Sequence, residues 1–402
     1  MESARIVGGL ARFTGDFSRA EDLAQEAVAE ALVSWTVNGI PDDPRAWLST
    51  VGRRRAIDDF RRRSNRDAKY AQLIRDMEDH EPGIDAVFDP EAIDDDILAL
   101  MFVSCHPVLS KESRIALTLR TVAGLSSDAI AKAFLVPTAT IQARITRAKK
   151  TLAAAQVPFG VPDGSERIER LGSVLHVIYL IFTEGSTATS GEEWIRTDLA
   201  DEARRLARIL VRLVDEPEAH SLLALLELTA ARFPARLDRD GKPVLLEQQD
   251  RRRWDRSAIR RGRAALASAV AAGRGLGAYG LQASIAECHA VAPSIEETDW
   301  DRIVVLYEAL GRLAPSPVVD LNRAVAVAMR SGPAAGLEIV DQIVARGELA
   351  NTHLVPTVRG EMLARLGRRN EALTEYQRAV GLCGNASERD VLEEKLRDLL
   401  DA

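Results

Sequence analysis

The stretch Gly124–Leu152, GLSSDAIAKAFLVPTATIQARITRAKKTL, predicts two short helices around a tight turn. Ser126 or Ser127 caps the first helix, which ends before Pro137 because proline disfavours helix in the residue preceding it. The second helix opens at Pro137 or Thr138. Its apolar residues repeat at four-three-four spacing and mark one buried face: Ile141, Ile145, Ala148 and Leu152.

The other faces of this second helix are polar at the start and basic toward the end. They carry Thr138, Thr140, Gln142, Arg144, Thr146, Arg147, Lys149 and Lys150. This order is typical of a DNA-binding helix-turn-helix, in which the first residues of the second helix meet base edges and the later cations hold phosphates. The alternative is an ordinary helical hairpin with a solvated charged face.

The composition of the 402 residues favours an all-α fold of two or three domains, with 46% hydrophobic but only 5% aromatic residues. The net charge of −7 would argue against nucleic acid if the charge were evenly spread. It is not: Arg53–Lys69 and Ile141–Lys150 are basic, whereas Arg75–Asp96 is acidic. Regional charge therefore decides the interpretation.

The three cysteines, Cys105, Cys288 and Cys383, are isolated and predict neither a disulfide framework nor a metal site. Cys105–His106–Pro107 reads as a packed loop, because partner ligands at fitting spacing are missing from the sequence. We expect no cofactor and a reducing, cytoplasmic setting without a signal peptide. The apolar run Val174–Phe182 is too short to span a membrane and predicts a buried helix.

Two earlier helices carry further candidate residues. In Arg19–Trp35, Asp22, Gln25 and Glu26 recur at three- and four-residue intervals and share one acidic patch. On its own, such a patch is more often only solvated surface. In the following helix one stripe begins with an aromatic ring and continues with charged groups: Trp47, Val51, Arg54, Asp58 and Arg61, flanked by Arg53, Arg55 and Arg62. A ring beside guanidinium groups suits separated DNA strands, through stacking and phosphate contacts. The alternative is a partly buried tryptophan beside a solubilising arginine run.

Taken in order, these segments resemble the two conserved regions of an extracytoplasmic-function (ECF) RNA polymerase sigma factor. The motifs are a DxxQEA helix, the AWLxTVxRRRAIDxxRR helix over Ala46–Arg62, an acidic linker, and the helix-turn-helix. The resemblance covers about Ile6–Leu152. It implies sigma region 2 at 1–66, a linker at 67–95, sigma region 4 at 96–156, and a helical extension at 157–402.

The resemblance also implies roles for the candidate residues. Asp22, Gln25 and Glu26 would dock on the core polymerase. The aromatic-arginine residues Trp47, Arg53, Arg54, Arg55, Asp58, Arg61 and Arg62 would capture and melt the −10 element. The helix-turn-helix residues Thr138, Thr140, Gln142, Arg144, Thr146, Arg147, Lys149 and Lys150 would read the −35 element of promoter DNA.

The extension predicts helices and, near 317–382, a repeat. Gly332 and Gly367 lie about one tetratricopeptide unit apart, and Gly360, Ala372, Tyr376 and Ala379 match its small and aromatic positions. A plain helical bundle is the alternative. With its sigma-like front, the chain resembles the ECF subgroup with a tetratricopeptide-like extension, which implies regulation by the extension and a partner among small proteins of the DGPF (YCII-related) type.

The sequence thus predicts a transcription initiation factor rather than an enzyme. A second hypothesis is a stand-alone helix-turn-helix regulator with a C-terminal sensing domain. This hypothesis gives no function to the aromatic-arginine helix. A third is an enzyme using Glu184, Glu247 or Asp250. The sequence shows no nucleophile–base pair, phosphate loop or metal cluster beside these carboxylates.

Overall fold

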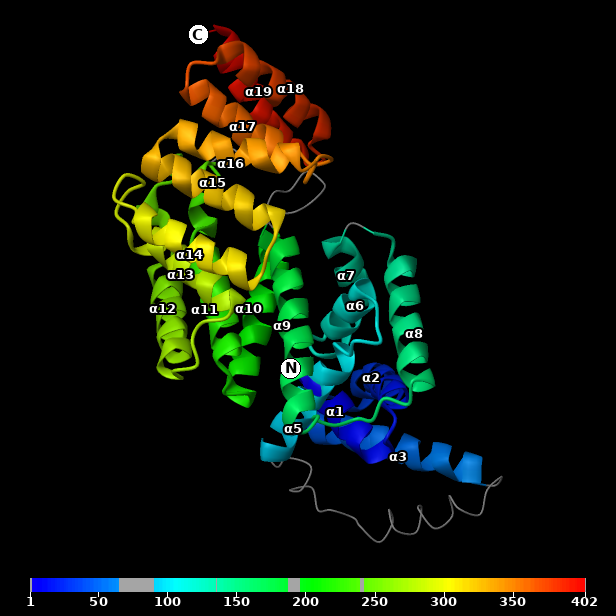
Figure 1. Ribbon diagram of the computed structural model, residues 1–402. Helices are drawn as coiled ribbons and strands as arrows, with labels where there is room; N and C mark the ends of the chain where they lie inside the picture. Colours follow the sequence, from blue (N-terminus) through cyan, green and yellow to red (C-terminus); the bar gives the residue numbers. More distant parts are fainter. Residues whose placement is uncertain (1, 65–89, 135, 187–195, 239–241, 402) are drawn as a thin grey trace. The chain divides into compact units, whose positions relative to one another are not determined.

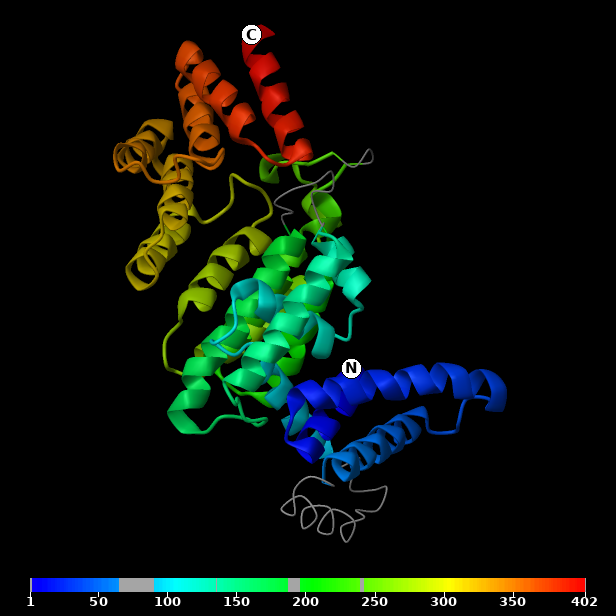
Figure 2. The ribbon, with the colours of Figure 1, turned by 90° about the vertical axis from the view of Figure 1, so that its right-hand side faces the viewer.

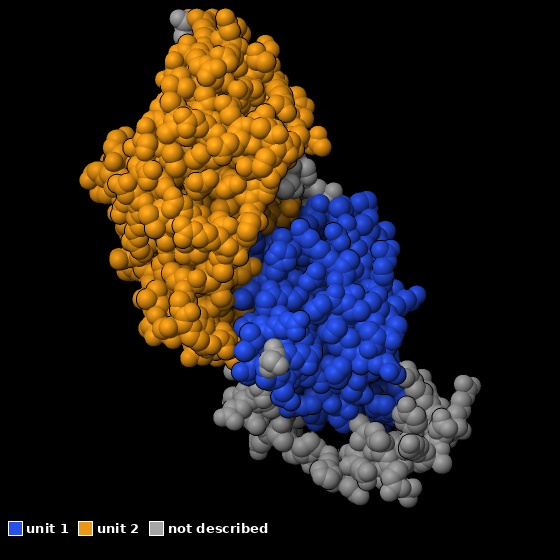
Figure 3. All heavy atoms as spheres, in the orientation of Figure 1, with its two compact units in different colours: residues 1–180 blue, residues 181–402 orange. Residues whose placement is uncertain are grey.

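The computed structural model describes residues 2–64, 90–134, 136–186, 196–238 and 242–401 (Figure 1). Within these ranges the elements are helices, joined by short 3₁₀ turns and one isolated bridge between Leu237 and Pro243, so the all-α prediction is confirmed. The chain forms two compact units, residues 1–180 and 181–402, coloured separately in Figure 3. Among the described helices none is long and apolar enough to cross a membrane.

Unit 1 begins with three helices that pack on one another: α1 (Glu2–Thr14), α2 (Phe17–Asn38) and α3 (Pro44–Ser64). Asp16 caps α2 by accepting a hydrogen bond from the Arg19 backbone N–H at 3.0 Å. Gly52 lets α3 approach α1 closely, because a Cβ there would lie 2.8 Å from Cδ1 of Leu10. The two helices predicted to carry the acidic patch and the arginine stripe, α2 and α3, also pack on each other.

The rest of unit 1 consists of α5 (Pro90–Ser104), α6 (Lys111–Thr121), α7 (Ser127–Ala133), α8 (Thr138–Ala154) and the first part of α9 (Gly164–Ser186). Helices α7 and α8 form the predicted hairpin. The four-three-four face of α8 is buried as expected, at Ile141, Ile145, Ala148 and Leu152. Helix α5 begins at Pro90, so the last residues of the predicted 67–95 linker are helical; proline is favoured in a first helical turn. The remainder of that linker lies outside the described residues.

Unit 2 continues from the end of α9 through ten helices of the described chain (Figures 1 and 2). They are α10 (Thr197–Leu213), α11 (Pro217–Ala230), α12 (Arg256–Ala271), α13 (Ala278–Val291), α14 (Trp300–Leu313), α15 (Pro317–Ser331), α16 (Pro333–Ala345), α17 (Leu354–Arg365), α18 (Arg369–Leu382) and α19 (Ala386–Asp401). Between α11 and α12 the chain makes 3₁₀ turns and buries Trp254.

The predicted repeat corresponds to two successive helix pairs, α15 with α16 and α17 with α18. Gly332 and Gly367 lie at the two turns with φ of +94° and +75°, conformations that favour glycine. Gly360 lets α17 approach α18, since a Cβ there would lie 3.2 Å from the Tyr376 ring. Tyr376, Ala372 and Ala379 are buried in this contact, which explains the small and aromatic pattern.

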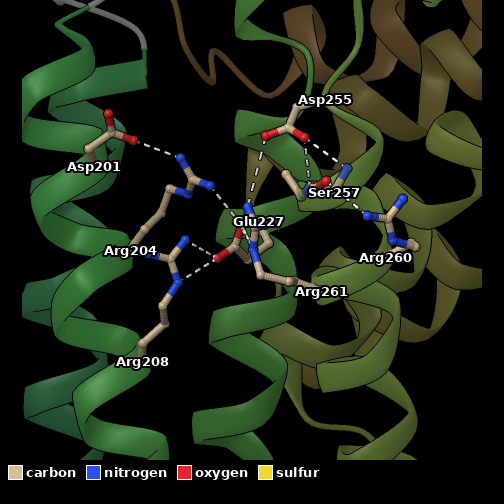
Figure 4. A network of polar contacts seen from close by, with 9 residues as sticks. Asp201, Arg204, Arg208, Glu227, Asp255, Ser257, Arg260 and Arg261 are labelled. Atoms are coloured by element: carbon tan, nitrogen blue, oxygen red, sulfur yellow. Dashed lines mark hydrogen bonds and ion pairs between the residues drawn. The ribbon is translucent and has the colours of Figure 1, made fainter.

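A buried carboxylate joins three helices of unit 2 (Figure 4). Glu227 of α11, whose side chain is 1% exposed, accepts hydrogen bonds from Arg204 and Arg208 of α10 and from Arg261 of α12. Burial alone would raise the pKa of Glu227. Hydrogen bonds from Arg261 and Arg204 outweigh burial and hold this pKa below its ordinary value of 4.5.

Replacing Glu227 with glutamine is expected to lower the free energy of unfolding of unit 2 by about 3–5 kcal/mol, since it removes the carboxylate's charge from among three arginines. Because the folded-state pKa is depressed, the contribution of Glu227 is fully present above pH 4.5 and is lost as the pH falls through the folded pKa. Urea unfolding at neutral and acidic pH measures both effects. Asp201→Asn, which removes an exposed partner of Arg204, is the matched control and should cost under about 1 kcal/mol.

Candidate functional site

The predicted acidic patch lies on the N-terminal half of α2, and its three residues differ in their surroundings. Asp22 and Gln25 are exposed. Glu26 is half-buried and accepts hydrogen bonds from Arg19 at 3.3 Å and from Arg55 at 2.9 Å. The patch is therefore less uniformly solvated than the spacing alone indicates.

Helix α8 contacts this patch through Lys149. The Lys149 Nζ donates to a carboxylate oxygen of Glu21 and, at 2.9 Å, to Oδ1 of Asp22, although the two helices are more than a hundred residues apart in sequence. Arg120 of α6 lies 3.4 Å from Glu21 as well. Burial opposes the charge on Lys149, but the field and hydrogen bond of Glu21 raise its pKa overall. Sequence reasoning missed Glu21, whose side chain is only 4% exposed.

Beside the acidic patch, α2 continues as an apolar surface. A cavity of about 470 Å³ opens between α1, α2 and α6, and its lining includes Glu21, Gln25, Val28 and Leu32. Beyond it the large apolar side chains of α2 and the following turn stay exposed: Val28, Leu32, Val33, Val37 and Ile40. We call these five residues the α2 apolar surface. Exposed large apolar side chains gathered on one element mark an interaction site more often than singly scattered ones do.

On α3 the predicted stripe is exposed at its charged positions and half-buried at its ring. Arg54, Asp58 and Arg61 are exposed at four- and three-residue spacing. Trp47 packs edge-to-face on Trp35 of α2, with ring centroids 5.5 Å apart and planes at 62°. Its ring is thus held in place while part of its surface remains accessible, and Trp35 is a neighbour that the sequence pattern did not identify.

The other arginines of α3 have structural partners. Arg55 donates to Glu30 at 2.6 Å and to Glu26 of α2, and these hydrogen bonds raise its pKa. Arg53 lies over the Phe13 ring at 5.5 Å, and burial together with the neighbouring Arg12 lowers its pKa. The side chain of Arg62 lies outside the described residues. Among the described arginines of the α3 stripe, exposed Arg54 is therefore well placed to meet a ligand from solvent.

The candidate residues of α8 fall into two sets. Gln142, Thr146, Arg147 and Lys150 are exposed, whereas Thr138, Thr140 and Arg144 are half-buried. The Thr138 hydroxyl donates to Asp128 of α7 at 2.8 Å and fixes the start of α8 against the first helix of the hairpin. Lys149 faces α2 rather than the surface that carries Arg147. Four of the eight candidate residues are therefore exposed, and one of the other four, Lys149, contacts α2.

The carboxylates considered for an enzyme are each paired with an arginine in unit 2. Glu184 accepts from Arg196 at 2.8 Å, Asp250 accepts from Arg252 at 3.0 Å, and Glu247 lies 4.0 Å from Arg365. Hydrogen bonds from Arg252 lower the pKa of Asp250, so this group is a poor proton acceptor. These contacts support structural roles for the three residues.

A helix-turn-helix hairpin with exposed basic residues, in the same unit as a helix carrying a ring and exposed arginines, is the arrangement expected of a DNA-binding protein of transcription. Comparison with known proteins specifies the class. Residues 2–66 match the family Sigma-70 region 2, residues 99–152 match Sigma-70, region 4, and residues 170–270 match a family of unknown function (DUF6596). The chain is also 46% identical over 397 residues to Uncharacterized protein R00370 of Rhizobium meliloti (strain 1021), covering 98% of this chain and 93% of the relative.

The chain therefore belongs to the sigma-70 family of transcription initiation factors, as an ECF-like sigma factor with a C-terminal extension. The resemblance inferred from the motifs is confirmed. Members of the sigma factor families are DNA-binding regulators of transcription. The extension includes the match to the family of unknown function, at residues 170–270.

Proposed function

We propose that this sigma factor binds core RNA polymerase through α2 and directs it to promoters through α3 and α8. The observation that carries the proposal is the α2 apolar surface next to Asp22 and Gln25. It offers apolar area for burial together with polar groups that fix orientation, the combination found in protein interfaces. Polymerase docking through Asp22, Gln25 and Glu26 would extend over this surface.

We assign the promoter contacts to those candidate side chains that are accessible to solvent. Arg54 is exposed and would approach phosphates of a separated strand, and Trp47 offers part of a ring to an unstacked base. On α8, Gln142 and Thr146 would meet base edges, and Arg147 and Lys150 would hold phosphates of the −35 element. This assignment gives no direct promoter contact to four other candidates: Arg53, Arg55, Asp58 and Lys149.

We assign sigma region 2 to 1–66, the linker to 67–95 with α5 beginning inside it, sigma region 4 to 96–156, and a regulatory helical extension to 157–402. The two helix pairs α15–α16 and α17–α18 support a tetratricopeptide-like array in the extension, a type of surface that binds protein. A small protein of the DGPF (YCII-related) type is the partner we propose for it. Cytoplasmic localisation follows from the role in transcription.

Polymerase docking is tested by replacing Leu32, which is 69% exposed, with glutamate. The variant should fold normally and lose at least tenfold in affinity for core polymerase in a direct binding assay without DNA, because a charge enters the α2 apolar surface. The matched control is Leu313→Glu, at a leucine of α14 that is 56% exposed. Equal affinities of the two variants would contradict the assignment of α2 and would favour a regulator that binds promoters without polymerase.

Removing one phosphate contact should change the salt dependence of promoter binding. For Arg147→Ala we expect the slope of log affinity against log salt concentration to flatten by roughly one unit, since each neutralised phosphate contributes about that much. Titration of a labelled −35 duplex between low and moderate salt measures the slope. An unchanged slope would place Arg147 away from the DNA backbone.

A further inference from the structure

Three metal-ligating side chains meet where the last helices of unit 2 join. His353 directly precedes α17, Cys383 caps the C-terminus of α18, and Glu388 lies in the first turn of α19. Sequence spacing concealed this group, because the three residues are separated by 30 and 5 positions along the chain. The side-chain donor atoms all lie within 4.8 Å of one another.

The distances in this group are close to those between the ligands of a tetrahedral ion. His353 Nε2 lies 3.4 Å from Oε2 of Glu388, and the Cys383 Sγ lies 3.9 Å from the same oxygen. Around Zn²⁺, with bonds of about 2.0–2.3 Å, neighbouring donor atoms are about 3.3–3.7 Å apart. The imidazole and carboxylate are therefore already spaced as around such an ion, whereas the thiol would have to move closer to both, since the donor atoms of the group lie within 4.8 Å of one another.

The protein surroundings are consistent with an ion at this place. Cys383 is buried at 2% exposure, whereas His353 and Glu388 are half-buried, which leaves an entry path from solvent. A thiolate and a carboxylate together balance the charge of a divalent cation. Two guanidinium groups lie near the site: that of Arg389 donates to the Cys383 carbonyl oxygen at 2.6 Å, and that of Arg236 interacts electrostatically with Glu388.

Helix α19 would gain most from such an ion. Among the described residues of α19, Leu392 alone is buried. It packs in a small cluster with Tyr376, Ala379 and Cys383. Leu396 and Leu399 of α19 add partly buried apolar contacts, and the contact of His353 with Glu388 adds a polar link. Bonds from α17, α18 and α19 to one ion would fix all three helix ends.

We propose that His353, Cys383 and Glu388 form a binding site for a zinc-class divalent cation in the C-terminal extension. Binding converts the Cys383 thiol to a thiolate and releases one proton, and leaves one coordination position open to water or to a partner's side chain. The site is independent of the polymerase and DNA surfaces, so its existence does not depend on the proposed function.

The test is a titration of the reduced, full-length protein with Co²⁺, followed by displacement with Zn²⁺. We expect one equivalent of Co²⁺ to give a tetrahedral visible spectrum and a thiolate-to-cobalt charge-transfer band, both lost on adding Zn²⁺. Cys383→Ser should abolish the charge-transfer band, and the buried-cysteine control Cys288→Ser should keep it. His353→Gln and Glu388→Gln should each weaken Co²⁺ binding at least tenfold while circular dichroism shows an intact fold.

Two outcomes would overturn the proposal: absence of the charge-transfer band in the wild-type protein, or an unchanged band in Cys383→Ser. Should Cys383→Ser fail to fold, Glu388→Gln decides, because its side chain is partly exposed and its replacement keeps the shape. Unaltered Co²⁺ affinity in that variant would likewise reject the site. Bound Zn²⁺ should also slow proteolytic removal of α19 in the wild type and leave the rate unchanged in Glu388→Gln.

Discussion

Replacing Lys149 with glutamate is expected to raise the affinity of the full-length protein for core polymerase by roughly 5–30-fold. In the free protein Lys149 occupies Glu21 and Asp22, and Asp22 belongs to the proposed docking face. Docking would require α8 to release this contact. The apparent affinity is then the intrinsic affinity multiplied by the fraction of molecules in which the contact is broken. The substitution removes a largely buried cation and places a negative charge beside Glu21. It should shift the equilibrium toward molecules without the contact by about 1–2 kcal/mol.

The control for this experiment is Lys150→Glu, an exposed lysine of the same helix that changes the charge of α8 equally. Binding is measured without DNA, because both lysines are candidate phosphate contacts. Equal affinities for the Lys149 and Lys150 variants would show that α8 does not compete with the polymerase for α2. Reduced affinity of the Lys149 variant alone would place Lys149 in the polymerase interface itself.

The second large effect is expected for Trp47→Ala combined with Arg54→Ala. Promoter opening should fall by roughly 100-fold, since stacking of one base on an aromatic ring is worth about 1–3 kcal/mol and Arg54 contributes a phosphate contact. Binding to core polymerase should stay within about twofold of wild type, because neither residue lies on the α2 apolar surface. Fluorescence of 2-aminopurine within the −10 element reports strand separation.

Arg55→Ala provides the contrast to that double variant. Its guanidinium is held by Glu26 and Glu30 on α2, so its loss should loosen the packing of α2 on α3 and lower thermal stability before it affects strand capture. Parallel loss of polymerase binding and promoter opening in Trp47→Ala, Arg54→Ala would contradict the division of roles between α2 and α3.

Local patterns in the sequence predicted the parts of the site that local physics determines. The apolar spacing of Ile141, Ile145, Ala148 and Leu152 requires one face of α8 to be buried, and that face is buried. The spacing of Arg54, Asp58 and Arg61 places them together on the exposed side of α3. Helical periodicity of 3.6 residues is sufficient for both results.

Contacts between distant segments could not be predicted in the same way. The pairing of Lys149 with Glu21 depends on how α8 packs on α2, and the charge pattern of neither helix specifies the other. The acidic composition predicts a linker up to residue 95, whereas α5 begins at Pro90. The contact of Trp47 with Trp35 likewise requires the crossing of α2 and α3, which Gly52 and Leu10 help to set on the α1 side.

Promoter-specific transcription tests the central claim most directly. Full-length protein is mixed with purified core polymerase and template libraries carrying varied −35 and −10 elements, and run-off transcripts are sequenced. The account predicts initiation that requires the protein, selects one pair of elements, and is lost in Trp47→Ala, Arg54→Ala. Sequence-specific DNA binding by the protein without any initiation by added core polymerase would contradict it.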